Sequence, residues 1–195
     1  MAEILLFHHA LGQTTGFLTF AGELRVAGHT VHTPDLFAGQ TFATVAEGVA
    51  HARELGFGNV LDAGVAAADP YPAELVYAGF SLGVMPAQKL AQSRAGARGA
   101  LLFESCVPTS EFGDGWPVSV PVQIHGMNAD PFFALEGDID AARALVEEVG
   151  SGGQAELFVY PGDQHLFADS SLASYRADAA ALLTERVLAF LSAVS

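Results

Sequence analysis

The chain alternates short, almost wholly apolar segments with longer segments of helical periodicity, and this alternation limits its fold more than any other feature. Six segments are typical of buried strands: residues 4–8, 29–33, 75–78, 99–104, 121–125 and 155–160. Helical patterns lie between and after them, at 15–27, 44–55, 60–68, from the third strand to about 94, 139–149 and 172–193. Strands that alternate with helices favour right-handed crossovers. We therefore expect an α/β fold: a three-layer α/β/α sandwich around a mostly parallel, doubly wound sheet of about six strands.

The size and composition of the chain indicate one domain that spans residues 1–195. No repeat or shift in composition divides it, and 51% of its 195 residues are hydrophobic. Its net charge of −14 argues against nucleic acid and anionic membranes as partners, because both require clustered basic residues. The N-terminus lacks a signal-peptide pattern, and no apolar run approaches the roughly 18 residues of a membrane span. We expect a cytoplasmic protein, a monomer or a homodimer.

The segment Gly79-Phe80-Ser81-Leu82-Gly83 matches the G-x-S-x-G pattern of a nucleophile elbow. Such an elbow requires a strand before it and a helix after it, and both are predicted here. The glycines allow close backbone contacts in a sharp turn that exposes the serine hydroxyl. The pattern predicts Ser81 as a nucleophile, with the backbone N–H of Leu82 donating to an oxyanion. Pro86 follows closely, and we expect it to distort the start of the helix.

A serine nucleophile requires a histidine base that is oriented by an acid, and on this scaffold the chain order is Ser, Asp or Glu, then His. Asp130 falls in the loop after the fifth predicted strand, and His165 falls in the loop after the sixth. Asp163 is too close to His165 in sequence to align well with its ring, and Glu136 and Asp138 are typical of a helix start. We predict Asp130 as the orienting acid and His165 as the base.

The loop after the first strand, His8-His9-Ala10-Leu11-Gly12, is expected to supply the second oxyanion donor through the backbone N–H of Ala10. Adjacent residues of a strand point to opposite faces, so His8 and His9 are not expected to bind one metal ion. His125 adds a third histidine near a strand end, but no ligand spacing is present. We predict no metal and no cofactor, a buried His8, and a His9 that lines the substrate pocket.

Four aromatic residues near the predicted strand ends suit either an apolar substrate pocket or ordinary core packing: Phe37, Phe132, Phe133 and Phe167. Of these, Phe37, Phe133 and Phe167 are our candidates for substrate binding. Residues 105–120 have no clear periodicity and carry glycine and proline, which predicts a surface loop of the kind that often binds ligands. Cys106, the one cysteine, is interpreted as a small buried residue.

These motifs together resemble the dienelactone hydrolase family of α/β-hydrolases, over nearly the whole chain. The residues that carry the resemblance are HHALG, GHTVHTPDLFAGQT, YAGFSLG, IHGMNADPF and YPGDQHLF. The resemblance implies a minimal hydrolase without a cap domain that cleaves a small ester or lactone through an acyl-enzyme. It agrees with the roles predicted above for Ser81, Asp130, His165, Leu82 and Ala10.

Three features depart from the enzyme that names this family. That enzyme has a cysteine at the position of Ser81 and a glutamate at the position of His9, and its pocket holds arginines that bind a carboxylate. Here Ala168 and Asp169 follow His-Leu-Phe, where a base would be expected. We therefore expect a serine esterase for a largely neutral acid. Thioester or amide hydrolysis, and a hydrolase-fold binding protein without turnover, are the alternatives.

Overall fold

The structure, a computed structural model, describes residues 1–150 and 154–195. Its centre is a six-stranded sheet in the order β2-β1-β3-β4-β5-β6, and every pair of neighbouring strands is parallel. The strands are β1 (Glu3–Phe7), β2 (Thr30–His32), β3 (Val76–Phe80), β4 (Gly99–Phe103), β5 (Val122–Met127) and β6 (Ala155–Tyr160). This confirms the predicted α/β fold, with a sheet that is wholly rather than mostly parallel.

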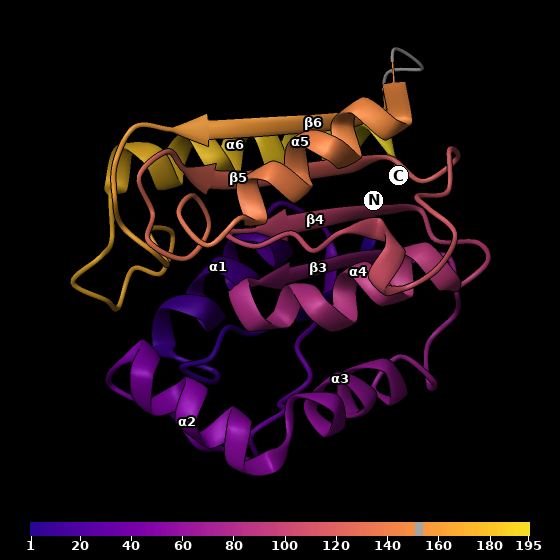
Figure 1. The fold of residues 1–195 in the computed structure, drawn as a ribbon. Helices are drawn as coiled ribbons and strands as arrows, with labels where there is room; N and C mark the ends of the chain where they lie inside the picture. Colours follow the sequence, from indigo (N-terminus) through magenta and orange to yellow (C-terminus); the bar gives the residue numbers. More distant parts are fainter. Residues whose placement is uncertain (151–153) are drawn as a thin grey trace.

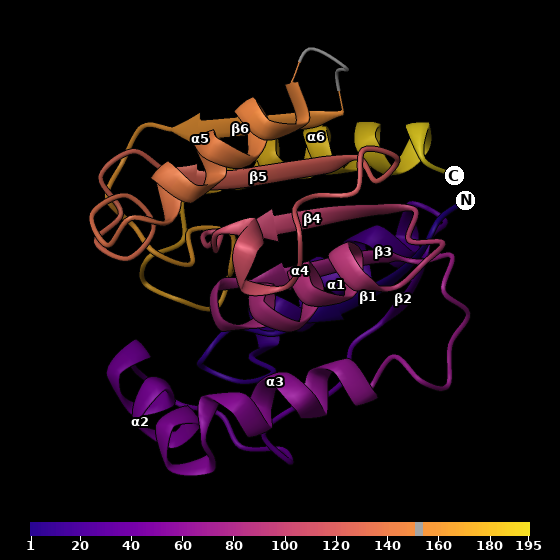
Figure 2. The same ribbon diagram turned by 45° about the vertical axis from the view of Figure 1, so that its right-hand side comes forward.

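Helices cover both faces of this sheet (Figure 1). They are α1 (Thr15–Val26), α2 (Val45–Leu55), α3 (Phe57–Ala66), α4 (Val84–Ser93), α5 (Asp138–Val149) and α6 (Ala177–Ala193). In both ribbon views α1 and α6 lie behind the sheet, and α4 and α5 lie in front of it (Figure 2). α2 and α3 lie below α4 in both views. Among the described residues no separate cap domain stands over the sheet.

The alternation of side chains along the buried strands divides the core into two layers. In β1, Ile4 and Leu6 pack with α1 and α6, whereas Leu5 and Phe7 pack with α4 and α5. All four side chains are fully buried. A parallel sheet that is apolar on both faces requires helices on both sides, so this pattern explains the three layers.

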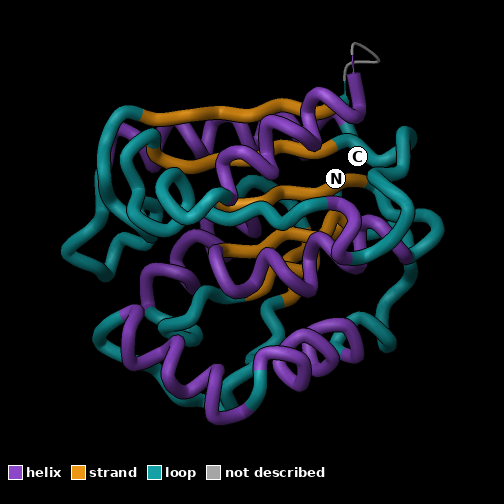
Figure 3. Tube along the Cα trace, viewed as in Figure 1, coloured by secondary structure: helices purple, strands orange, loops and turns teal. Residues whose placement is uncertain are grey.

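The loops that follow the strands gather at one end of the sheet, where the arrows point in Figure 1; these loops are the teal segments on the left of Figure 3. This is the end at which ligands bind in open parallel sheets. Within the described part of the chain, no helix has both the length and the apolar character to cross a bilayer.

The last helix begins later than its periodicity predicts, at Ala177 instead of residue 172. The residues before it form successive turns, in which the amide of Leu172 donates to the carbonyl of Asp169 and that of Tyr175 donates to the carbonyl of Leu172. The Asp169 carboxylate also accepts the amide of Ser171 at 2.9 Å. These local bonds compete with the helical pattern and delay the helix.

The loop at residues 105–120 is fastened to the helices beside it and contains a short 3₁₀ turn, Thr109–Glu111. Gln88 of α4 donates to the carbonyl of Val107 at 2.7 Å and accepts its amide at 3.1 Å. Glu148 of α5 accepts the amide of Trp116 at 2.7 Å, and the Trp116 side chain is buried. The segment is thus a surface loop with anchored ends and a buried aromatic residue.

Candidate active site

The turn that follows β3 has the sharp geometry of the predicted elbow. Ser81 has a φ angle of 48°, in the left-handed region that residues with a side chain rarely occupy. A Cβ atom on Gly79 would lie 2.1 Å from the carbonyl oxygen of Gly83, and one on Gly83 would lie 2.6 Å from the carbonyl oxygen of His8. Both glycines are therefore required by close backbone contacts around Ser81.

Pro86 lies in the first turn of α4 and not in the helix interior. A single 3₁₀ turn, Ser81–Gly83, separates the serine from α4, which begins at Val84. Amides in the first turn of a helix have no intrahelical acceptor, so the missing N–H of Pro86 removes no helical hydrogen bond. The irregular turn precedes Pro86, and α4 runs from Val84 to Ser93 through the proline without a break. Pro86 also packs on Gly64 of α3, where a Cβ would lie 2.5 Å from the proline Cβ.

Three side chains that are far apart in the sequence meet at the carboxyl end of the sheet. The Nε2 atom of His165 lies 2.9 Å from the Oγ atom of Ser81. Its Nδ1 atom lies 2.8 Å from Oδ2 of Asp130, whose side chain is fully buried. The carboxylate can accept a hydrogen bond from Nδ1–H. Nε2 then carries no proton and can accept a hydrogen bond from the serine hydroxyl. The arrangement has the contacts that a nucleophile, a base and an orienting acid require.

Asp130 is held by its own loop. Its Oδ1 atom accepts the backbone amides of Phe132 at 2.8 Å and Phe133 at 3.3 Å, so one oxygen is bound to the backbone and the other faces His165. Of the competing acids, Asp163 accepts the side chain of Gln164. Asp138 instead accepts the Ser105 hydroxyl at 2.6 Å.

The environment of His165 favours its protonated form. Burial alone would lower the pKa of the imidazole, but the hydrogen bond to Asp130 and the charges of Glu104, Asp130 and Asp138 together raise it above the usual value of 6.5. A raised pKa makes the imidazole a stronger base once it is deprotonated.

The loop after β1 approaches the elbow and is fixed by a close helix contact. A Cβ on Gly48 of α2 would lie 1.9 Å from the carbonyl oxygen of Ala10, so only glycine allows α2 to pack there. Gly12 has a φ angle of 81° and its amide donates to the carbonyl of His9 at 3.0 Å. Among the described residues, the amide of Ala10 has no hydrogen-bond partner within the chain. Leu82 is the second residue of the 3₁₀ turn, directly after Ser81.

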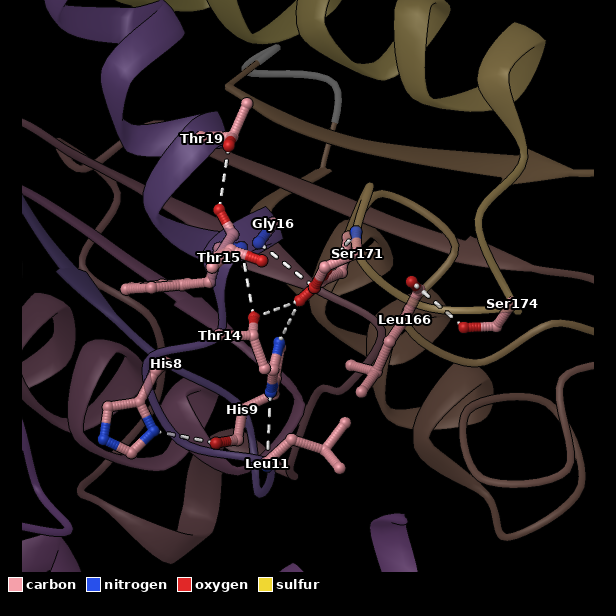
Figure 4. Close-up of polar contacts among 12 residues, drawn as sticks. His8, His9, Leu11, Thr14, Thr15, Gly16, Thr19, Leu166, Ser171 and Ser174 are labelled. Carbon is pink, nitrogen blue, oxygen red and sulfur yellow. Dashed lines mark hydrogen bonds and ion pairs between the residues drawn. The ribbon is translucent and has the colours of Figure 1, made fainter. Parts of the chain in front are cut away.

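His9 does not line a pocket, which corrects the expectation from the sequence. Its ring is 1% exposed, and both ring nitrogens are engaged: Nδ1 accepts the amide of Leu11 at 3.2 Å and Nε2 lies 2.9 Å from Oδ2 of Asp169. Asp169 also accepts the hydroxyls of Thr14 and Ser171. Figure 4 shows His9 between Leu11 on one side and Thr14 and Ser171 on the other. The ring fastens the loop after β1 to the loop that carries His165.

The three phenylalanines proposed for substrate binding are also buried, so in this structure they offer no surface to a ligand. Phe37, Phe133 and Phe167 are at most 1% exposed. Phe133, for example, covers Gly126 so closely that a Cβ there would lie 2.2 Å from its ring. Core packing is therefore the correct interpretation for these three. Phe132, by contrast, is 38% exposed, and its ring centroid lies 4.6 Å from that of His165.

The remaining histidines near the strand ends are separate core residues. His8 is buried, and its Nε2 accepts the amide of Leu36 at 3.0 Å. His125 is buried beside Tyr160, and burial lowers its pKa to about 3. Across residues 1–150 and 154–195, no group of three or more possible metal ligands comes together. Cys106 is buried as expected, and burial raises its pKa to about 12.

Two carboxylates next to this site have contacts that the sequence did not predict: Glu104 was assigned no role, and Asp169 was expected to face the substrate pocket, whereas its carboxylate binds His9. Glu104 follows β4 at the rim of the sheet and is 1% exposed, and Asp169 is 5% exposed beside His9. The available signal for Glu104 was an acidic residue at the very end of an apolar strand. Asp169 offered no comparable signal, because its partner lies 160 residues away.

Comparison with solved structures gives the same fold. A Klebsiella pneumoniae subsp. pneumoniae protein assigned to the dienelactone hydrolases aligns with a TM-score of 0.71 and 20% identity, over 98% of this chain and 87% of that one. A dienelactone hydrolase-like promiscuous phosphotriesterase from metagenomic libraries aligns with a TM-score of 0.73 and 17% identity, over 100% and 87%. Thermogutta terrifontis esterase 2, phosphonylated by sarin, aligns with a TM-score of 0.68 and 14% identity, over 100% and 84%.

No match is found among curated proteins. The sequence profile of the dienelactone hydrolase family, however, matches residues 2–195. Together with the elbow after β3 and the parallel sheet, this match assigns the protein: the chain belongs to the dienelactone hydrolase family.

Proposed function

We propose that the protein is a serine hydrolase that cleaves a small carboxylic ester or lactone through an acyl-enzyme intermediate. In the first half, Nε2 of His165 takes the hydroxyl proton of Ser81 while the serine oxygen attacks the carbonyl carbon. The oxyanion is stabilised by the amides of Leu82 and Ala10 and by the N-terminus of α4. The imidazolium then gives its proton to the leaving alcohol as the carbon–oxygen bond breaks.

In the second half, water replaces the alcohol beside His165. The imidazole takes a proton from water, the hydroxide attacks the acyl carbon, and the proton returns to Ser81 as the acid leaves. Throughout, Asp130 keeps the Nδ1–H tautomer and stabilises the imidazolium. For a lactone the leaving alcohol stays attached to the acyl group, so one product is released.

The observation that carries this proposal is the unbroken chain of contacts from Ser81 through His165 to Asp130. Its two distances, 2.9 and 2.8 Å, are within hydrogen-bonding range, and the serine stands on a strained turn at the start of a helix. A half-buried serine in the left-handed region, joined to a buried histidine–aspartate pair, is a strained arrangement of the kind that clusters at active sites.

The charges around the site favour an acyl group without a carboxylate. The carboxyl groups of Glu104, Asp130 and Asp138 all act on the imidazole of His165, and no lysine or arginine is among the groups that shift its pKa. Asp138 is near enough to His165 to influence its pKa. An anionic substrate would be repelled here.

Two of the similar structures carry organophosphorus chemistry in their descriptions, a phosphotriesterase and an esterase phosphonylated by sarin. For this chain, Ser81 is expected to accept a phosphonyl group from a fluorophosphonate probe. Thioester or amide cleavage would use the same residues, and a substrate panel separates these reactions.

The test is hydrolysis of a panel of p-nitrophenyl esters, thioesters, anilides and small lactones by the wild type, Ser81→Ala and His165→Ala. We expect turnover of neutral esters or lactones by the wild type and its loss in both variants. His32→Ala is the matched control, because His32 pairs with Glu3 at the far edge of the sheet and its loss should leave turnover unchanged.

Two outcomes would overturn the proposal. One is a folded wild type that neither turns over any member of the panel nor reacts with a fluorophosphonate, which would indicate a binding protein. The other is turnover that persists in Ser81→Ala, which would place the nucleophile elsewhere.

A further inference from the structure

Glu104 is a buried acid with an unsatisfied oxygen. Within residues 1–150 and 154–195, its Oε2 is the one fully buried side-chain nitrogen or oxygen without a hydrogen-bond partner. Its backbone is also unusual, with a φ angle of 61° that only a few residues other than glycine adopt. An acid in a strained conformation in a dry environment is unfavourable for folding, so its presence calls for a local reason.

The position of Glu104 in the sheet supplies that reason. β4 lies between β3, which carries Ser81, and β5, which precedes Asp130. The amide of Glu104 donates to the carbonyl of His125 at 2.6 Å, at the end of the adjacent strand. Its carboxylate lies near His165 and Asp130, whose charges both act on it.

The carboxylate of Glu104 holds the backbone directly after His165. Its Oε1 accepts the amide of Phe167 at 2.8 Å, and the amide of Leu166 also stabilises the carboxylate. Leu166 itself has a φ angle of 60°. Two strained residues, one on each side of this contact, thus fix the turn that aims the imidazole at Ser81.

Few charged groups act on Glu104 and His165. Glu104 faces His165 and Asp130, and His165 faces Glu104, Asp130 and Asp138. Burial raises the pKa of Glu104 to about 7, although the charge of His165 and the two amides oppose this shift. Because the charge of each group shifts the pKa of the other, the protonation of Glu104 and that of His165 are coupled.

We propose that Glu104 is a positioning residue for His165: its carboxylate fastens the turn behind the imidazole, and its negative charge stabilises the protonated imidazole. The inference rests on the proposed function, in which His165 becomes an imidazolium in each half of the reaction. Glu104 acts through His165 and does not contact the substrate.

The variant that separates charge from shape is Glu104→Gln, which keeps an oxygen for the Phe167 amide and removes the charge. We expect the pKa of His165 to fall by roughly one unit. Since catalysis needs the neutral imidazole, the acidic limb of the kcat/KM profile should move to lower pH by a similar amount. The plateau rate should fall about tenfold, because the imidazolium is less stabilised in the transition state.

The matched control is Glu148→Gln. Glu148 also accepts a backbone amide, that of Trp116, but it lies on α5 and is not among the charges that act on His165. We expect no movement of the acidic limb in this variant. Thermal unfolding of each variant shows whether a rate change reflects folding.

The direct readout is an NMR titration of the His165 ring, assigned by comparison with His165→Ala. It requires no turnover, so it tests Glu104 even if the protein proves not to be an esterase. A folded Glu104→Gln whose His165 titrates at the wild-type pH or above would overturn the inference, as would an equal shift in Glu148→Gln.

If Glu104→Gln does not fold, the wild type supplies the second measurement. The carboxyl carbon of Glu104 and the ring of His165 should then report the same coupled titration steps. Two independent single-step titrations would contradict the proposal.

Discussion

The protein contains two buried histidine–aspartate pairs of nearly equal length, and they differ in what the second ring nitrogen meets. His165 lies 2.8 Å from Asp130 and His9 lies 2.9 Å from Asp169. The free nitrogen of His165 faces the hydroxyl of Ser81, whereas that of His9 accepts the backbone amide of Leu11. A histidine–carboxylate pair is thus available as a base only where its other nitrogen reaches a reactive group.

The two pairs also differ in how their acids are used. Asp130 gives one oxygen to two backbone amides and the other to His165. Asp169 accepts hydrogen bonds from His9, Thr14 and Ser171. Burial by itself would raise the pKa of Asp169, but these hydrogen bonds lower it to about 2. In the proposed function the first pair takes up a proton from Ser81, whereas the second joins segments that are distant in the sequence.

The largest expected effect comes from removing Ser81 or the His165 ring of the first pair. Ser81→Ala and His165→Ala should each lower kcat by about 10⁵-fold, because residues of such a unit act together. Steady-state hydrolysis of the best ester of the panel measures this effect. A loss of less than tenfold in either variant would mean that the reaction does not depend on Ser81 and His165.

The next effect distinguishes the two acids. Asp130→Asn should lower kcat by about 10⁴-fold, because an amide in place of the carboxylate favours the wrong tautomer of His165. Asp169→Asn, the same change in the second pair, should lower kcat less than about tenfold. Similar losses in both variants would contradict the separation of roles.

Asp169→Asn should affect the stability of the fold more than it affects kcat. Its substitution by asparagine leaves the His9 ring and the hydroxyls of Thr14 and Ser171 with a weaker acceptor, at a cost of about 2 kcal/mol. For a chain of this length that corresponds to a fall of roughly 5 °C in Tm. Thermal unfolding at neutral pH measures it, and an unchanged Tm would show that the second pair fastens nothing.

The smallest expected effect is on acid stability. The pKa of Asp169 is about 2 in the folded chain, below the ordinary value of 3.8, so its contribution is fully present above pH 4 and is lost as the pH falls toward 2. The stability difference between the wild type and Asp169→Asn should therefore shrink across this range. Urea unfolding at pH 7, 4 and 3 follows it, and a difference that grows on acidification would have the wrong sign.

The features that the sequence predicts well follow from local pattern and topology. Apolar strands between helical segments lead to a parallel sheet, and a parallel sheet brings the ends of all strands to one rim. The placement of Ser81, Asp130 and His165 follows from that rule together with the chain order. Their catalytic roles remain a prediction that the variants above test.

The features that the sequence does not predict depend on packing in three dimensions. His9 lies in the right loop for a pocket residue, but its partner Asp169 is 160 positions away and closes it off. Phe133 is buried because Gly126 leaves room for its ring. Glu104 is bound by the turn at Leu166, whose φ angle of 60° no local sequence pattern predicts.

The most direct measurement is the rate at which a fluorophosphonate labels Ser81, with the adduct located by peptide mass spectrometry. The account predicts fast labelling of Ser81 in the wild type, nearly the same rate in Asp169→Asn, and a rate at least about a hundredfold slower in Asp130→Asn and His165→Ala. An adduct on another residue, or equal rates in Asp130→Asn and the wild type, would contradict it.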